Sequence, residues 1–140
     1  MYDEDMQPRD GNPFQALEEQ RAVKVDPKLS AAELLIAIST ACGRAPSVRV
    51  AAPNYVTTEL CEQTKPKRRL VHLVNYKPSS PASDVKLQVC VPQAWKVRQV
   101  ALLSPESPQR RPLPFEQAGN RVRVLVPKLE VYALVSIEPE

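Results

Sequence analysis

The residue types that carry nucleophilic or acid–base catalysis are few in this sequence, and their spacing is unfavourable. The single histidine, His72, lies inside the hydrophobic run 70–74, whereas a nucleophilic Ser or Cys needs an adjacent histidine that a third group orients. Acid–base catalysis by two carboxylates requires a shared cleft. Glu59 and Glu62 belong to one predicted strand, but an offset of three residues places them on opposite faces. We therefore expect no catalytic constellation in this chain and interpret His72 as a core or interface residue.

The remaining candidates for acid–base or metal chemistry do not form a recognisable pattern. Acidic residues from position 84 onward are expected at strand ends or in turns, as solvated surface charges, so we expect no cleft in which ionisable groups converge. They are Asp84, Glu106, Glu116, Glu130, Glu138 and Glu140. Cys42, Cys61 and Cys90 fit neither a zinc-ligand spacing nor a closed disulfide framework. The three glycines are isolated, so no phosphate loop is predicted. We expect buried, reduced thiols, no metal and no cofactor.

A basic run and a few aromatic residues are the remaining candidates for binding. The run at 65–69, Lys-Pro-Lys-Arg-Arg, has the composition of a nucleic-acid patch, but it lacks interleaved aromatic residues and sits between two predicted strands. We interpret it as a solvated hairpin tip and expect no nucleic-acid partner. Trp95 and Tyr76, with Tyr55 and Tyr132, would form a sugar-stacking platform if they shared an exposed face, although core or edge packing is the commoner role.

Composition places the chain among ordinary water-soluble domains. Of its 140 residues, 43% are hydrophobic and 25% are charged, which is typical of one folded domain. The net charge of +3 does not by itself indicate a nucleic-acid or membrane partner. No apolar run is long enough to cross a bilayer, and the acidic N-terminus does not resemble a secretory signal. With reduced thiols, these features favour a cytoplasmic location.

Periodicity divides the chain into a tail, a helix and a β region. Residues 1–29 are polar and broken by proline, and are predicted to be a tail or linker. Ser30 and Glu33 form a capping box at the start of a helix that ends near Gly43, so residues 30–45 are assigned to a helix. Its apolar face needs a partner, because so short a helix is marginal alone.

Residues 46–140 alternate with the period of two that is typical of strands. About seven short strands separated by turns predict a mainly β fold, an antiparallel β-sandwich preceded by one short α-helix and an irregular tail. The predicted strands are 48–50, 56–60, 70–76, 85–91, 97–103, 121–126 and 131–137. Residues 70–76 are apolar on both faces, which indicates a central strand.

Residues 69–76 read Arg-Leu-Val-His-Leu-Val-Asn-Tyr. This segment resembles the R-x-V-H-L-V-N-Y strand in the C-terminal β-domains of certain multidomain, β-galactosidase-like glycoside hydrolases. The neighbouring segments resemble the flanking strands of those domains, so that the resemblance covers about residues 30–140. These segments are 48–53, 56–63, 85–91, 97–103, 122–127 and 129–132. The Pro-rich stretch 104–115 and the tail match no part of that pattern.

In such enzymes a catalytic (β/α)8 barrel is followed by a trimerisation-type domain and then by a small β-sandwich. The resemblance implies that the predicted helix is the last helix of the middle domain, and that the partner is a catalytic or trimerisation-type domain of a parent enzyme. It also implies a packing role, with no catalytic residue, for the motif strand. The motif residues are Val71, His72, Leu73, Val74, Asn75 and Tyr76.

The leading hypothesis is a non-catalytic C-terminal accessory β-sandwich domain, or fragment, of a glycoside hydrolase-like protein, with a structural and interdomain role. One alternative is a carbohydrate-binding module in which Trp95 and Tyr76 contact sugar. Another is a stand-alone protein-interaction β-domain with an acidic N-terminal tail and a basic hairpin.

Overall fold

The computed structural model describes residue 26 and residues 28–140, so the predicted tail lies outside the described residues except at its end. The chain divides into two compact units, Met1–Ala45 and Pro46–Glu140. No helix within the described residues is long and apolar enough to cross a lipid bilayer.

The described part of the first unit contains helix α2, Ala31–Ala41. The predicted capping box is confirmed, because the Ser30 side chain accepts a hydrogen bond from the Glu33 amide while the Glu33 carboxylate accepts one from the Ser30 amide. Gly43, with φ of +62°, ends the helix in a Schellman arrangement, in which the Gly43 and Arg44 amides donate to the carbonyls of Thr40 and Ser39. None of the helix residues is buried, so its apolar side chains remain exposed.

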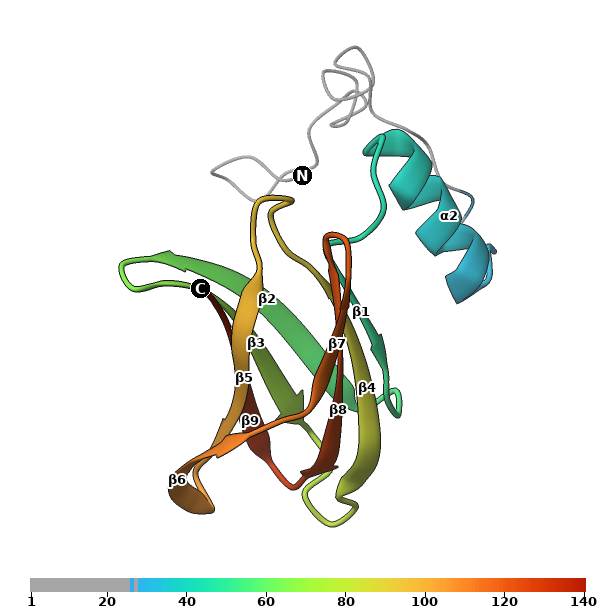
Figure 1. Ribbon diagram of the computed structural model, residues 1–140. Coiled ribbons are helices and arrows are strands. Elements are labelled where there is room, and N and C mark those ends of the chain that lie inside the picture. The colour runs from blue at the N-terminus through green and yellow to red at the C-terminus, as the bar shows by residue number, and fades with distance from the viewer. Residues whose placement is uncertain (1–25, 27) are drawn as a thin grey trace, which may run out of the picture. The chain divides into compact units, whose positions relative to one another are not determined.

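The second unit is an antiparallel β-sandwich, as predicted, with nine strands in the described residues rather than about seven. One sheet has the order β1-β4-β8-β7 and the other β2-β3-β9-β5-β6, and Figure 1 shows the two sheets facing each other. The strand bounds of the four-stranded sheet are β1 Val48–Ala51, β4 Ala82–Cys90, β7 Phe115–Ala118 and β8 Arg121–Leu129. Those of the five-stranded sheet are β2 Val56–Thr64, β3 Lys67–Asn75, β5 Val97–Ser104, β6 Ser107–Pro112 and β9 Tyr132–Pro139.

The core lies between the sheets and is built from alternate residues of the long strands. Val71 and Leu73 of β3, Val85 and Val89 of β4, and Val122 of β8 are fully buried. β-Branched valines suit this position because they pack well on a pleated surface and lose little side-chain freedom. The predicted central position of residues 70–76 is confirmed, since β3 pairs with β2 on one side and with β9 on the other.

The two strands that the sequence did not reveal, β6 and β7, lie in and next to the Pro-rich stretch. β6 is an edge strand, paired only with β5, and proline is tolerated there because one side of an edge strand donates no ladder hydrogen bonds. Leu113 then returns to the core, where it is 5% exposed and its amide donates to the Val100 carbonyl. Proline conceals the period of two in β6, and β7 has only four residues in which a period of two could be recognised.

Asn75 is a buried polar residue that fixes the end of β3. Its side-chain amide donates to the carbonyls of Ser80 and Glu130, at 3.0 and 2.7 Å, and its carbonyl accepts from the Lys77 amide at 2.8 Å. Only 1% of the surface of Asn75 is exposed, so these three hydrogen bonds replace those that its side chain makes with water in the unfolded chain. It thereby ties the turn after β3 to the connection between β8 and β9.

We predict that Asn75→Ala lowers the free energy of unfolding by about 2–3 kcal/mol, because it removes three hydrogen bonds made by a buried side chain. Tyr76→Ala is the control, since Tyr76 is 71% exposed, and should change the stability by less than about 0.5 kcal/mol. Urea unfolding of the two variants measures both values. Equal losses at the two positions would contradict the role assigned to Asn75.

Candidate functional site

The structure separates the two residues that were predicted to contact sugar. Trp95 is 4% exposed and belongs to the hydrophobic core, whereas Tyr76 is 71% exposed. A sugar ring stacks on an exposed aromatic face, so Trp95 offers no platform in this conformation. Its indole Nε1 is buried with no hydrogen-bond partner among the described residues. A sugar contact at Tyr76 stays a prediction.

The basic run is not a solvated hairpin tip, because its last three residues belong to β3. The tip itself is only Lys65 and Pro66, between β2 and β3. Lys67 and Arg69 lie over the Trp95 ring, at 5.7 and 6.0 Å from its centroid. Arg69 also pairs with Glu62 at 2.8 Å and donates to the Cys90 carbonyl of the opposite sheet. These contacts close one end of the sandwich.

His72 lies on the outer face of the five-stranded sheet rather than in the core. It is half-buried, and its Nδ1 is 2.8 Å from the Tyr132 hydroxyl. Glu59 is its Cα partner on the neighbouring strand, but no hydrogen bond or ion pair joins Glu59 to His72 among the described residues. The histidine therefore lies on the outer surface of the sheet, with a hydrogen-bond partner on β9.

Three arginines converge on Glu138 on the same outer face. They come from three strands, Arg68 on β3, Arg98 on β5 and Arg110 on β6. Arg110 donates directly to the Glu138 carboxylate, which also accepts from the Ser136 hydroxyl at 3.0 Å; Arg68 and Arg98 approach to 4.0 and 3.9 Å.

The Glu138 cluster, Glu138 with these three arginines, overturns one expectation. The Glu138 side chain is only 14% exposed, so it is not a solvated charge at a strand end. Arg110, on edge strand β6, reaches across β5 to the Glu138 carboxylate on β9. Burial alone raises the pKa of Glu138, but the hydrogen bonds from Arg110 and Ser136 and the charges of Arg110 and Arg68 outweigh burial and hold it below its usual value.

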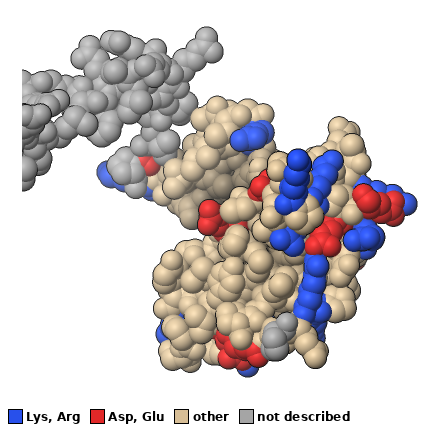
Figure 2. All heavy atoms as spheres, turned by 90° about the vertical axis from the view of Figure 1, so that its left-hand side faces the viewer, with Lys and Arg blue, Asp and Glu red and all other residues tan. Residues whose placement is uncertain are grey.

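Beside the cluster, the outer face of the five-stranded sheet is apolar. The β3 residues that point outward are Leu70, His72 and Val74, since those between them are buried. They pair with outward residues of β9, and Leu134 pairs in turn with Leu103 of β5. Figure 2 views the molecule from the left-hand side of Figure 1, where these strands lie. Most of the charged side chains in this view lie on one part of the surface. Cys61 and Tyr132 also point outward and are half-buried, whereas Ala101 on the same face is fully buried.

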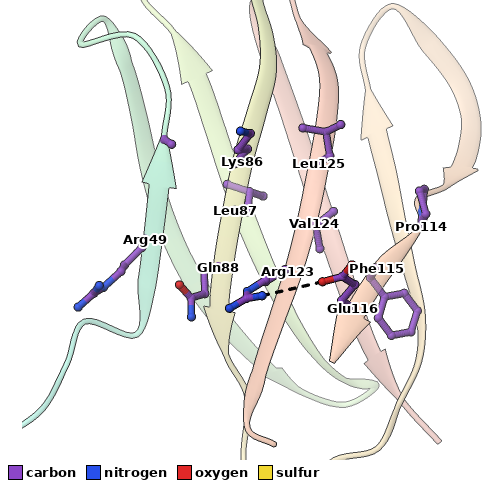
Figure 3. A pocket seen from close by; sticks show the side chains of 11 residues that line it. Arg49, Lys86, Leu87, Gln88, Pro114, Phe115, Glu116, Arg123, Val124 and Leu125 are labelled. Carbon is purple, nitrogen blue, oxygen red and sulfur yellow. Dashed lines mark ion pairs between the residues drawn. The ribbon is translucent and has the colours of Figure 1, made fainter. Parts of the chain in front are cut away.

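The outer face of the four-stranded sheet has a different character, because it carries a groove of about 630 Å³. Four polar side chains cross it in one row, since Arg49 pairs with Gln88, Gln88 with Arg123, and Arg123 with Glu116. Figure 3 shows Arg123 directed toward Glu116, at 4.0 Å. Lys86 lies in the next row, and the apolar lining includes Ala51, Pro114, Phe115 and Leu125.

The cysteines were expected to be buried, but none of the three is buried. Cys42 is exposed, and Cys61 and Cys90 are half-buried. Desolvation, followed by the charge and hydrogen bonding of Glu59, raises the pKa of the Cys61 thiol, which disfavours the thiolate. Within the described residues, no three His, Cys, Asp or Glu side chains are placed to hold a metal ion.

Sequence reasoning missed both the groove and the Glu138 cluster. Alternation in the predicted strands does place Arg49, Gln88 and Arg123 on the solvent-facing side of their strands, but it cannot show that these strands are neighbours. The strand order that places them side by side depends on connections that cross between the sheets.

The fold is shared with parts of two known enzymes. A chain titled alpha-L-fucosidase isoenzyme 2 from Paenibacillus thiaminolyticus matches with a TM-score of 0.64 and 24% sequence identity, over 76% of this chain and 17% of its own length. A cycloisomaltooligosaccharide glucanotransferase from Paenibacillus sp., complexed with cycloisomaltoheptaose, matches with a TM-score of 0.53 and 16% identity, over 71% of this chain and 19% of its own. No family model and no curated protein matches the sequence.

The class that these observations define is a β-sandwich of the kind found as one domain within a glycoside hydrolase and a glucanotransferase chain. The present chain spans less than a fifth of the length of either enzyme.

We predict that Glu138→Gln lowers the free energy of unfolding at neutral pH by about 1–2 kcal/mol, because the charge-assisted hydrogen bond from Arg110 to the Glu138 carboxylate is weakened. Since the folded pKa of Glu138 lies below the ordinary value of 4.5, its ionised form stabilises the fold above that pH, and this contribution is lost as the pH falls through the folded pKa. The difference between wild type and variant should therefore shrink below about pH 4.5.

Urea unfolding at several pH values measures the effect. Glu116→Gln is the matched control, because Glu116 is 82% exposed and 4.0 Å from Arg123, and such a surface pair contributes little. A stability difference for Glu138→Gln that does not vary with pH would contradict the assigned ionisation.

Proposed function

We propose that this chain supplies a non-catalytic accessory β-sandwich domain that packs against the catalytic part of a glycoside hydrolase-like protein. The partial match to two carbohydrate-active enzymes supports this proposal.

The observation that carries the proposal is the apolar outer face of β3, β9 and β5. A sandwich that stands alone in water normally alternates apolar residues inward with polar residues outward. Here Leu70, Val74 and Leu134 point outward, although the inner face of the same strands already forms the core. A second apolar face has a physical purpose if another protein surface covers it.

Charge at the edge of this face supports a specific docking geometry. The Glu138 cluster has three positive charges and one negative charge, so it retains a net positive charge beside the apolar patch. A partner surface with an apolar centre and a carboxylate at its rim would be complementary, with burial supplying affinity and the charges supplying orientation.

We predict that the purified chain does not hydrolyse aryl glycosides. A continuous assay of chromophore release over a panel of these substrates measures this directly. Turnover that is abolished by replacing a single carboxylate, for example Glu138→Gln or Glu59→Gln, would overturn the proposal. Turnover that neither variant nor heating changes would come from a contaminant and not from this chain.

We further predict that Leu134→Lys weakens association with the catalytic module of a glycoside hydrolase from the same genome by about tenfold or more, since a charge would be buried in an apolar interface. Sedimentation of the mixed proteins measures the dissociation constant. Lys86→Gln, on the opposite sheet, is the control and should leave it unchanged. Failure of every such module to bind, or equal binding by Leu134→Lys, would contradict the docking face.

A further inference from the structure

We propose that the groove on the outer face of the four-stranded sheet binds an anionic saccharide, one whose sugar rings carry carboxylates as well as hydroxyls. This inference rests on the proposed function, because it assigns a carbohydrate ligand to a domain that works beside a carbohydrate-active enzyme. It concerns the sheet opposite the docking face, so that both surfaces can be occupied at once.

The charge of the groove selects an anion. Arg49, Lys86 and Arg123 line it and Glu116 is the one acidic residue in its lining, which leaves a net charge of +2. Arg123 is 66% exposed and its contact with Glu116 is long, at 4.0 Å, so most of its donors face solvent. An exposed guanidinium is suited to bidentate hydrogen bonding with a carboxylate.

The spacing of the polar row suits an extended ligand rather than a single ion. Arg49 and Arg123 are two strands apart, with Gln88 between them. Neighbouring strands are about 4.8 Å apart, so the two arginines originate about 10 Å from each other. This is about the length of a disaccharide, and a chain of acidic sugars lying across the strands could present one carboxylate to each arginine.

The mixture of donors and acceptors favours a sugar over an acidic peptide. Glu116 lies in the row with Arg123 and would repel the side chains of a run of acidic residues, whereas it can accept hydrogen bonds from sugar hydroxyls. Gln88 can both donate and accept. Peptides are commonly bound at the backbone of a free sheet edge, and this row is made by side chains across the face of the sheet.

The aromatic content of the groove disfavours a neutral sugar. Phe115 is the one aromatic side chain in its lining, and it is half-buried. Without an exposed ring for stacking, affinity must come from charge-assisted hydrogen bonds, which a neutral sugar cannot match. The apolar lining at Ala51, Pro114 and Leu125 can still contact the C–H faces of a sugar ring.

Calorimetric titration of the full chain with uronate oligosaccharides tests the proposal, using oligogalacturonate, oligomannuronate and hyaluronan fragments. The matched comparison ligands are methyl-esterified oligogalacturonate, which lacks the charges, and a glutamate peptide of equal charge. We expect at least one uronate to bind about tenfold more tightly than its neutral ester and the peptide, because each bidentate Arg–carboxylate contact contributes strongly. No binding by any uronate at millimolar concentration, or equal binding by the peptide, would overturn the proposal.

Substitutions locate the binding site. Arg123→Gln should weaken uronate binding about tenfold, and Arg123→Lys should weaken it less, since it keeps the charge but loses the bidentate geometry. Lys86→Gln should also weaken it, whereas Lys96→Gln removes the same charge from an 80% exposed lysine outside the groove and should not. Equal effects of Lys86→Gln and Lys96→Gln would indicate non-specific charge attraction and contradict the proposed site.

The docking variant separates this inference from the proposed function. Leu134→Lys should leave uronate binding unchanged, because Leu134 belongs to the other sheet. Uronate binding without association to any catalytic module would contradict the docking function alone. Association without uronate binding would contradict the saccharide site alone.

Discussion

The structure depends on one constraint, that a β-strand presents successive side chains to opposite faces. In β3 this constraint assigns every residue a role. Lys67 and Arg69 turn toward Trp95 at the end of the core, and Arg68 between them turns outward to Glu138. A run that looks like a single basic patch in the sequence is therefore divided between two layers. Neither half is available as a continuous surface for a polyanion.

The same constraint explains why Glu138 can remain charged while largely buried. Its position on β9 faces outward, next to Ser136, which is itself fully buried beneath longer side chains. A lone carboxylate there would lose its hydration and its charge would be destabilised. Arg68 and Arg98 from the flanking strands β3 and β5, and Arg110 reaching across β5 from β6, compensate for that loss. The interaction is a property of the strand order, and no single strand could produce it.

Features that depend on a few consecutive residues could be predicted from the sequence, whereas the order of the strands within each sheet could not. The Ser30–Glu33 capping box and the end of the helix at Gly43 follow from local rules, and the structure contains both. The alternation of Val85, Leu87 and Val89 likewise indicated a strand with one buried face. β6 was missed because proline interrupts alternation where an edge position makes proline acceptable, and β7 because it is only four residues long. The Glu138 cluster and the groove were missed because both depend on which strands lie side by side.

The two outer faces differ in a way that the core does not require. Stability of a sandwich needs only the inner faces to be apolar, and either outer face could then be polar throughout. The five-stranded sheet instead carries outward leucine and valine, while the four-stranded sheet carries arginine, lysine and glutamine around a groove. Because exposed apolar residues cost solubility and clustered cations repel one another, each face is unfavourable for an isolated domain. A covered apolar face on one side and an anionic ligand on the other, as we propose, would remove both costs.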